Sequence, residues 1–424
     1  MPTSLNIDKT NSIPNLRFNN FIDKWDEYKI SDRIQVIDGD RGSFYPKLTD
    51  FTFEGYCLFI NASNVTKNGF KFDELNFISK QKDEELRKGK LLRDDIVLTT
   101  RGTVGNIAYY DTNVPFENVR INSGMVLLRC DTNFINPNFL SILLSSSKSK
   151  KKIIRISFGS AQPQLTVREI NKLKIIVPSI KEQIKIASVL SAIDNWIENL
   201  TQQKFSLEKY KKGMMQKIFS QEIRFKDEDG KDFPEWEEIM LKDIANFLKG
   251  SGLSKEDISE DGVNKCIRYG ELYTDYREII SEVKSKTNID KNDYILSEEN
   301  DVLIPSSGET AIDIATASCV EEEGIILGGD INIVRFKDKN FGKYFTYYLS
   351  SFQKRQLARL AQGYSVVHLY ANHFKTLKIL LPSVDEQLKI VNYLSSIDEL
   401  IRIKEQQIKN ANIWKKGVMQ NLFI

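Results

Sequence analysis

The sequence predicts a mixed α/β protein in which two globular domains alternate with two long helices, which pack as an antiparallel coiled coil with a pseudo-twofold internal repeat. One observation is a helical segment that occurs twice, as VPSIKEQIKIASVLSAID from Val177 and LPSVDEQLKIVNYLSSID from Leu381. The other is a variable stretch before each copy, in which short apolar runs alternate with Gly, Asn and Asp turns. The chain is therefore predicted to be a tandem duplication of one unit.

The repeat keeps one register over the whole helix. Aligning Pro178 with Pro382 gives an offset of 382 − 178 = 204. The same offset pairs Asp194 with Asp398 and continues without a gap through KKGMMQKIF and KKGVMQNLF, with nearly half of the positions identical. Shared helical composition alone would give scattered matches, so the fixed register indicates duplication.

The variable parts are predicted to contain strands followed by a helix. DIVLTT, NIAYY and MVLLR are short β-prone runs, whereas PNFLSILLSSSKSKKKI and, in the second copy, FGKYFTYYLSSFQKRQLARLA have helical character. The predicted segments are an N-terminal tail at 1–15, a first globular domain at 16–164, a first helical region at 165–222, a second globular domain at 223–368 and a second helical region at 369–424.

The repeated helices have a defined start and a continuous apolar seam. Pro178 ends the preceding strand, and Ser179 with Glu182 matches the S-x-x-E capping box, which Ser383 and Glu386 repeat. Apolar residues then recur in alternating steps of four and three, as expected for a coiled coil. They are Ile186, Leu190, Ile193, Ile197, Leu200, Leu207, Met214 and Ile218, and in the second copy Ile390, Leu394, Ile397, Ile401, Ile408, Ala411, Val418 and Leu422. Since one amphipathic helix cannot cover its own stripe, we expect the two copies to pair, and we favour the antiparallel arrangement.

Composition excludes several classes of protein. The 424 residues carry a net charge of +2, with no apolar run long enough to span a membrane and no secretory signal, so we expect a cytoplasmic protein that does not contact membranes. The four scattered cysteines predict reduced thiols rather than a disulfide framework. Two histidines, His368 and His373, are too few for a His-rich metal site, and we expect no metal.

The sequence lacks several common catalytic motifs. It has no GxxxxGK[ST] phosphate loop, no GxSxG elbow, no HExxH, and no Asn/Asp-Pro-Pro-Tyr/Phe run of the kind that amino-methyltransferases use. RGTVG at 101–105 lacks the dinucleotide-binding spacing and is typical of a turn between strands. We therefore expect no catalysis by this chain and no cofactor bound to it.

The motif PS(I/V)xEQxKI…LSxID…KKGxMQ(K/N)xF in both copies, with GSAQPQLT at 159–166, resembles the specificity (S) subunit of type I restriction–modification systems over nearly the whole chain. The resemblance implies two target recognition domains, each reading one half of an asymmetric bipartite site in double-stranded DNA. It also implies helices that set the spacing and dock two methyltransferase (M) subunits, through which restriction/translocase (R) subunits join. S-adenosylmethionine, ATP and Mg would then belong to the partner subunits.

Candidate DNA-binding residues fall into two groups. Basic residues suited to phosphates are Lys150, Lys151, Lys152, Arg155, Lys354, Arg355 and Arg359. Loop residues suited to base edges are Arg101, which we favour, Ser160, Gln162, Ser306, Ser307, Tyr364 and His368. The structural alternative is a solvated helix face for each lysine and a turn or cap for each loop residue. The second copy departs from the resemblance here, because Val366 occupies the place that matches Gln162.

Candidate partner-binding residues come from the repeated helix: Gln183, Gly213, Met215, Gln216, Gln387, Gly417, Met419 and Gln420. A glycine inside a helix costs about 1 kcal/mol relative to alanine. Gly213 and Gly417 therefore indicate a helix break, close approach by a partner, or packing between the two helices. Two other functions stay open at this point: a tandem coiled-coil adaptor that binds only proteins, and a self-sufficient methyltransferase, which the missing motif disfavours.

Overall fold

The computed structural model describes residues 14–159, 163–363 and 365–423, which form two compact units. Unit 1 comprises Met1–Asn199 and Gln407–Ile424, and unit 2 comprises Leu200–Gln406. The boundaries between the units fall inside the two long helices, α6 (Ile180–Phe219) and α13 (Val384–Leu422), so each helix contributes to both units. This division by contacts differs from the segments predicted from the sequence, which stay predictions.

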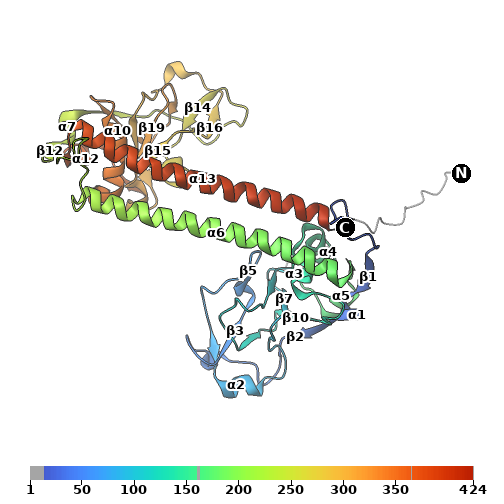
Figure 1. The fold of residues 1–424 in the computed structure, drawn as a ribbon. Helices are drawn as coiled ribbons and strands as arrows, with labels where there is room; N and C mark the ends of the chain where they lie inside the picture. Colours follow the sequence, from blue (N-terminus) through green and yellow to red (C-terminus); the bar gives the residue numbers. More distant parts are fainter. Residues whose placement is uncertain (1–13, 160–162, 364, 424) are drawn as a thin grey trace. The chain divides into compact units, whose positions relative to one another are not determined.

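Unit 1 is built on two small sheets and two strand pairs (Figure 1). An antiparallel sheet has the strand order β2-β10-β7-β8, and a three-stranded sheet has the order β6-β3-β9, with β3 and β9 parallel. Strand β1 pairs with β11, and β4 with β5. The bounds are β1 Asp26–Lys29, β2 Ile34–Asp38, β3 Cys57–Ile60, β4 Val65–Thr66, β5 Gly69–Phe70, β6 Phe77–Ile78, β7 Ile96–Thr99, β8 Ile107–Tyr109, β9 Val119–Ile121, β10 Met125–Cys130 and β11 Lys174–Val177. The strands predicted from DIVLTT, NIAYY and MVLLR are confirmed.

Unit 2 repeats the two sheets and the first strand pair, adds a strand to the main sheet, and has a separate pair formed by β18 and β22. Its main sheet has the order β13-β21-β17-β19-β15, its smaller sheet the order β16-β14-β20, and β12 pairs with β23. The additional strand is β15, which runs parallel to β19 at the edge of the main sheet. The equivalent sheet of unit 1 ends at β8, the counterpart of β19. The bounds are β12 Glu237–Met240, β13 Ala245–Lys249, β14 Asn264–Ile267, β15 Ile279–Ile280, β16 Ser285–Thr287, β17 Asp301–Pro305, β18 Ser307–Gly308, β19 Ser318–Val320, β20 Ile326–Leu327, β21 Ile331–Phe336, β22 Val367–His368 and β23 Lys378–Leu381.

The short helices of the two units also correspond. Those of unit 1 are α1 Ile30–Arg33, α2 Lys80–Glu85, α3 Pro137–Ser145, α4 Ser147–Ile156 and α5 Val167–Lys172. Those of unit 2 are α7 Leu241–Ile244, α8 Glu271–Thr274, α9 Ala311–Ile314, α10 Phe341–Tyr348, α11 Lys354–Leu360 and α12 Ala371–Phe374. The single helix expected over PNFLSILLSSSKSKKKI is two helices, because Ser146 takes an extended conformation (φ −63°, ψ 152°) and its hydroxyl accepts a hydrogen bond from the Ser149 amide. In unit 2, by contrast, Leu349–Gln353 continues the helical path from α10 into α11.

The long helices pack antiparallel, as predicted. In unit 1 the early part of α6, with Ile186 and Leu190, shares one core with Leu422 at the end of α13. In unit 2 the end of α6, with Ile218, shares a core with Ile390 and Leu394 near the start of α13. Figure 1 shows α6 in green and α13 in red running side by side. Within the ranges that the structure describes, no helix combines the length and the apolar character needed to cross a membrane.

Ion pairs repeat the symmetry. Lys415 pairs with Asp194 in unit 1, and the equivalent residues Lys211 and Asp398 pair in unit 2, at 2.7 Å. Each pair joins α6 to α13 with the roles exchanged, as the antiparallel arrangement requires. In the globular parts, Arg129 clamps Asp95 and Arg335 clamps Asp301 in the same two-contact geometry.

The glutamates of the predicted capping boxes have another role. Glu182 accepts two hydrogen bonds from Arg17, at 2.8 and 2.7 Å, and the equivalent Glu386 accepts from Arg224 and from Trp236 Nε1. Both glutamates are almost fully buried. A buried carboxylate needs strong donors, and distant arginines supply them in place of the helix's own amides.

Candidate nucleic-acid and partner interfaces

Helix α4 presents unpaired cations on one side. Ile153 is fully buried and anchors the helix, whereas Lys151, Lys152 and Arg155 are exposed. At about 100° per residue, Lys151 and Arg155 lie on the side of the helix opposite Ile153, and Lys152 lies on the flank beside them. None of them forms an ion pair or hydrogen bond with any residue in the described ranges, so their charges remain available to phosphates.

Lys150 lies on another side of α4, beside a second cation. Burial lowers the pKa of Lys150, and the positive charge of Lys67 in the β4–β5 turn lowers it further. Neither lysine has a recorded carboxylate partner among the described residues. Lys67 was missed in the sequence analysis. The run TKNG marks a hairpin turn, and a lysine in that turn was the available signal.

Arg101 is exposed in the turn after β7, next to α4. The backbone amide of Arg101 donates to the Gly124 carbonyl at 3.2 Å. In the same turn, a Cβ placed on Gly105 would lie 3.5 Å from Cγ2 of Ile153 in α4. Leu165 donates to the Thr100 carbonyl at 3.0 Å, so the end of the segment after α4 also meets this turn. Ser160 and Gln162, predicted in that segment, lie outside the described residues. The described parts thus bring Arg101 and the basic helix to one region of unit 1.

Unit 2 has the same arrangement of exposed cations. Arg355 and Arg359, one helical turn apart on α11, are exposed, and Lys354 is half-buried. At the offset of 204, Arg355 corresponds to Lys151, Arg359 to Arg155 and Lys354 to Lys150. Among the described residues, none of these three unit 2 cations has a recorded polar partner. The segment that follows also matches: a bridge joins Gln362 to His368 in unit 2 and Phe158 to Gln164 in unit 1.

The loop residues predicted to read bases in unit 2 have mixed positions. Ser306 is fully buried and Ser307 is 6% exposed, so neither hydroxyl is placed to contact DNA, and we leave both out of the proposed interface. His368 is partly exposed, with its ring stacked on Tyr370 at 5.7 Å between centroids. Tyr364 lies outside the described residues.

The glycines of the repeated helix face open space. Helices α6 and α13 continue without interruption through Gly213 and Gly417, so the helix-break interpretation is wrong. Apart from its own helix, no described atom lies within 4 Å of the position that a Cβ would take at either glycine. Packing between the two helices therefore does not explain them, and close approach by a partner is the alternative that fits.

The other candidates on the helices divide by exposure. Gln216 and Gln420 are exposed and Met419 is half-buried. Gln183, Gln387 and Met215 are buried, and we leave them out of the proposed partner surface. Gln183 donates to the carbonyls of Phe134 and Pro178 and accepts from the Asn136 amide, and Gln387 likewise donates to the Pro382 carbonyl. These amides hold the start of each helix in place.

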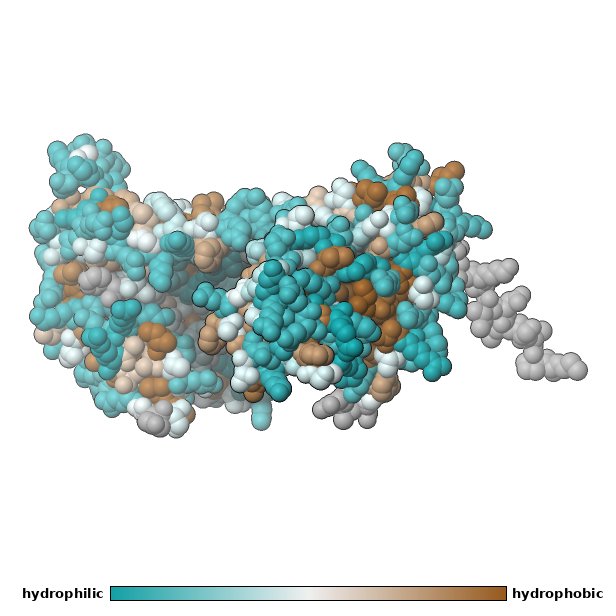
Figure 2. Space-filling model, turned by 90° about the horizontal axis from the view of Figure 1, so that it is seen from below, coloured by the Kyte–Doolittle hydropathy of each residue, from teal (hydrophilic) through white to brown (hydrophobic). Residues whose placement is uncertain are grey.

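Exposed hydrophobic side chains on the helices were missed in the sequence analysis. Hydrophilic residues predominate on the face drawn in Figure 2, with hydrophobic residues in separate patches. On the helices, exposed hydrophobic residues occur at equivalent positions: Trp196 and Leu400 are 49% and 48% exposed, and Tyr210 and Trp414 are 52% and 54% exposed. Each unit thus carries one member of each equivalent pair: unit 1 has Trp196 and Trp414, and unit 2 has Leu400 and Tyr210. Tryptophan beside a polar helix stretch was the available signal.

Comparisons with known proteins agree with the duplication. Residues 22–209 and again 234–412 match the family described as Type I restriction modification DNA specificity domain. The chain is 25% identical over 419 residues to the type I restriction enzyme MjaVIII specificity subunit of Methanocaldococcus jannaschii, covering 94% of this chain and 92% of that protein. It is 23% identical over 391 residues to the StySPI specificity subunit of Salmonella potsdam, covering 88% and 82%. The fold is similar to that of the S subunit of a type I restriction-modification system from M. genitalium, with a TM-score of 0.61, 18% identity, and 97% and 99% of the chains covered.

Proposed function

The chain belongs to the type I restriction–modification DNA specificity family and is the non-catalytic specificity subunit of such a system. We propose that its two units read two unlike halves of a bipartite double-stranded DNA site. The observation that carries the proposal is the pair of matched cation sets, Lys151 with Arg155 in unit 1 and Arg355 with Arg359 in unit 2. Cations left without internal carboxylates at equivalent places in both repeats are suited to phosphates on two half-sites.

The structural arginines support this assignment by contrast. Arg129, Arg335, Arg17 and Arg224 each have a buried or nearly buried carboxylate partner, and they hold the fold together. The cations of α4 and α11 have no recorded polar partner among the described residues. Specific bases would be read by nearby loop side chains, of which Arg101 is the favoured one in unit 1 because a guanidinium can donate twice to guanine.

Methylome mapping of cells that carry this chain with its methyltransferase tests the proposal. We expect a split, non-palindromic motif, because the variable parts of the two repeats differ in sequence. A palindromic motif would contradict two unlike readers. If no duplex were preferred over random competitor, the chain would act as an adaptor that binds only proteins.

Charge-reversal variants test the phosphate contacts. Lys151→Glu/Arg155→Glu and Arg355→Glu/Arg359→Glu should each weaken binding to all sequences, and each should reduce the slope of log K against log[salt] by roughly 1.8, for two contacts at about 0.9 each. Lys209→Glu, an exposed lysine of α6, is the matched control and should leave the slope unchanged. An unchanged slope in both double variants would remove α4 and α11 from the interface.

We further propose that each unit docks one methyltransferase subunit on its helices, at the open glycine and the exposed hydrophobic residues. Trp196→Ser/Trp414→Ser should reduce the number of bound methyltransferase subunits from two to one, and Leu400→Ser/Tyr210→Ser should do the same, as measured by native mass spectrometry. Val263→Ser, at an 85% exposed residue of a loop in unit 2, is the control. Two bound subunits in either double variant would contradict this placement.

A further inference from the structure

The lysine that joins the two long helices has different surroundings in the two units. In unit 2, Lys211 is 8% exposed and donates to Asp398 at 2.7 Å and to Glu278 at 2.8 Å. Its ammonium group also lies 5.0 Å from the centre of the Tyr347 ring, and the Tyr347 hydroxyl donates to Asp398 at 2.6 Å. Lys211 thus has two carboxylates, of which Glu278 comes from the globular part of unit 2.

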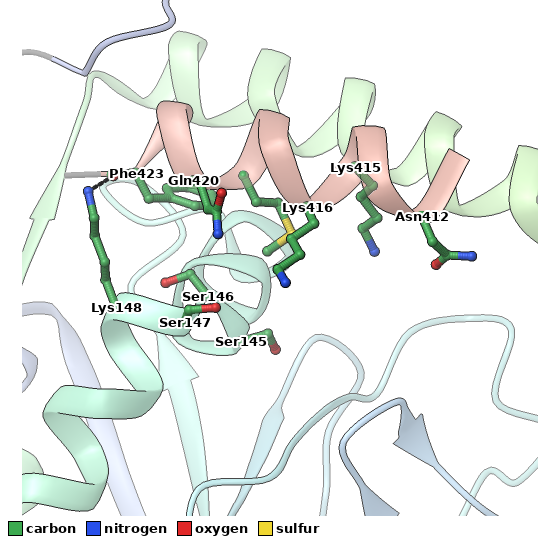
Figure 3. A pocket seen from close by; sticks show the side chains of 10 residues that line it. Ser145, Ser146, Ser147, Lys148, Asn412, Lys415, Lys416, Gln420 and Phe423 are labelled. Atoms are coloured by element: carbon green, nitrogen blue, oxygen red, sulfur yellow. Dashed lines mark hydrogen bonds between the residues drawn. The ribbon is translucent and has the colours of Figure 1, made fainter. Parts of the chain in front are cut away.

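In unit 1 the equivalent lysine borders an open cavity. Lys415 pairs with Asp194, and no second carboxylate from the described residues reaches it. Beside it lies a cavity of about 240 Å³ between the C-terminal part of α13 and the start of α4 (Figure 3). Lys148, Lys415, Lys416 and the serine run 145–147 line this cavity.

The difference has a cause in the fold. In unit 2, Arg277 and Glu278 directly precede β15, the additional strand of the main sheet, and this strand brings Glu278 to Lys211. In the corresponding part of unit 1, the described chain forms the β4–β5 hairpin, and the sheet ends at β8. The extended Ser146 also interrupts the path from α3 to α4, whereas α10 continues into α11 through helical residues. Unit 1 therefore lacks, in its described part, the segment that supplies the second carboxylate in unit 2.

We propose that this cavity receives an aspartate or glutamate side chain from the methyltransferase subunit that docks on unit 1. The inference rests on the proposed function and deepens it. Lys416 has no recorded partner among the described residues, and Lys148 donates only to the Phe423 carbonyl, at 2.9 Å, which is neutral. Of the three lysines that line the cavity, only Lys415 has a carboxylate partner among the described residues, Asp194, so a further carboxylate would complement the remaining positive charge.

Size and position favour this occupant. A water needs about 10–15 Å³ measured in the same way as this cavity, so its volume admits a carboxylate side chain together with waters. Met419 and Gln420 line the same cavity, and Gly417 of the proposed docking surface precedes them by two and three residues. A methyltransferase subunit on unit 1 would thus supply an acid that unit 2 supplies from its own chain.

Carbodiimide crosslinking of the assembled complex tests the inference, because this reagent joins an amine directly to a carboxylate in contact with it. We expect a crosslink between Lys416 and an acidic residue of the methyltransferase, and none from Lys212, the equivalent lysine of unit 2. Lys416→Glu should weaken binding of the methyltransferase to unit 1 about tenfold, whereas Lys212→Glu should change binding to unit 2 by less than twofold. Since Lys416 is exposed, neither Lys416→Glu nor Lys416→Gln should alter the circular dichroism of the chain, and Lys416→Gln should abolish the crosslink.

Two results would overturn the inference while leaving the proposed function in place. One is an assembled complex without the crosslink, in which Lys416→Glu and Lys212→Glu behave alike. The other is a Lys416→Glu chain that binds the methyltransferase as tightly as the wild type but loses DNA affinity in a salt-dependent way. That result would make the cavity a phosphate site. If the chain bound no methyltransferase subunit, both the proposed function and this inference would fall.

Discussion

Removal of Lys211 should destabilise unit 2 far more than removal of the equivalent Lys415 destabilises unit 1. Lys211→Met leaves Glu278 and Asp398, each 22% exposed, near each other without their shared cation. Breaking a buried ion pair from one side costs about 3–5 kcal/mol. Because both carboxylates keep some contact with solvent, we expect a loss of about 3 kcal/mol. The pair of Lys415 and Asp194 is 26% and 48% exposed, and an exposed pair contributes at most about 1 kcal/mol.

The pH dependence of the same variant follows from Glu278. Burial would raise the pKa of Glu278, but the charge and hydrogen bond of Lys211 outweigh it and hold that pKa below its usual value. A carboxyl group whose pKa is lowered by folding stabilises the protein above its unfolded pKa of about 4.3, and this contribution is lost as the pH falls through the folded pKa. In Lys211→Met the two largest lowering effects are lost, and burial, which raises the pKa of Glu278, is opposed only by the weaker effects of a backbone hydrogen bond and the charge of Arg277. The difference in unfolding free energy between wild type and variant should therefore shrink as the pH falls from 7 towards 4.

Urea unfolding gives the free energies, and hydrogen exchange assigns them to a unit. Exchange should accelerate in β15 and α10 of Lys211→Met, because these elements carry or adjoin Glu278 and Tyr347, while unit 1 should stay protected. Lys415→Met is the matched control. If the two variants differed by less than about 1 kcal/mol at pH 7, or if their difference grew on acidification, the buried network would not have the role assigned to it.

Three further outcomes are expected. Gly213→Ala and Gly417→Ala should each raise the unfolding free energy of the isolated chain by up to about 1 kcal/mol, since both sites are open. Both should nevertheless weaken methyltransferase binding. A lower unfolding free energy in urea would contradict this. Burial raises the pKa of Cys57 to about 12 and of Cys266 to about 11, so thiol reagents at pH 8 should label these cysteines only after unfolding, and rapid labelling of the native chain would refute their burial. Arg101→Ala should reduce discrimination at one base pair by about 1–3 kcal/mol in competition binding, whereas an equal loss on all sequences would mark Arg101 as a phosphate contact.

Much of the architecture follows from local sequence patterns. The alternating steps of four and three from Ile186 onward predict a seam, and Ile186, Leu190 and Ile193 are buried in it. The duplication makes many contacts in one unit a prediction for the other, and the pairs Lys415–Asp194 and Lys211–Asp398 agree with the antiparallel arrangement that the repeat favours. Contacts between residues at equivalent positions of the two repeated helices can be predicted in this way.

Side-chain exposure at the candidate sites could not be predicted in the same way. Gln183 and Gln387 belong to the most similar part of the repeat, but their amides bond carbonyls at the start of each helix, and this similarity reflects folding. Ser306 has the residue type of a loop contact but is buried beside β18. A donor or acceptor in the sequence carries no sign of whether a distant backbone group has already satisfied it.

The sequence by itself determined the duplicated plan, the paired helices and the family, because periodicity, capping residues and register are properties of neighbouring positions. Only the tertiary structure decided which charges are satisfied within the chain and which remain available. Lys211 and Lys415 are the same residue in the same motif, yet an additional strand gives one of them a second carboxylate and leaves the other beside an open cavity. The carboxylate that separates them, Glu278, is 67 residues away from Lys211 in the chain, and folding alone brings it there.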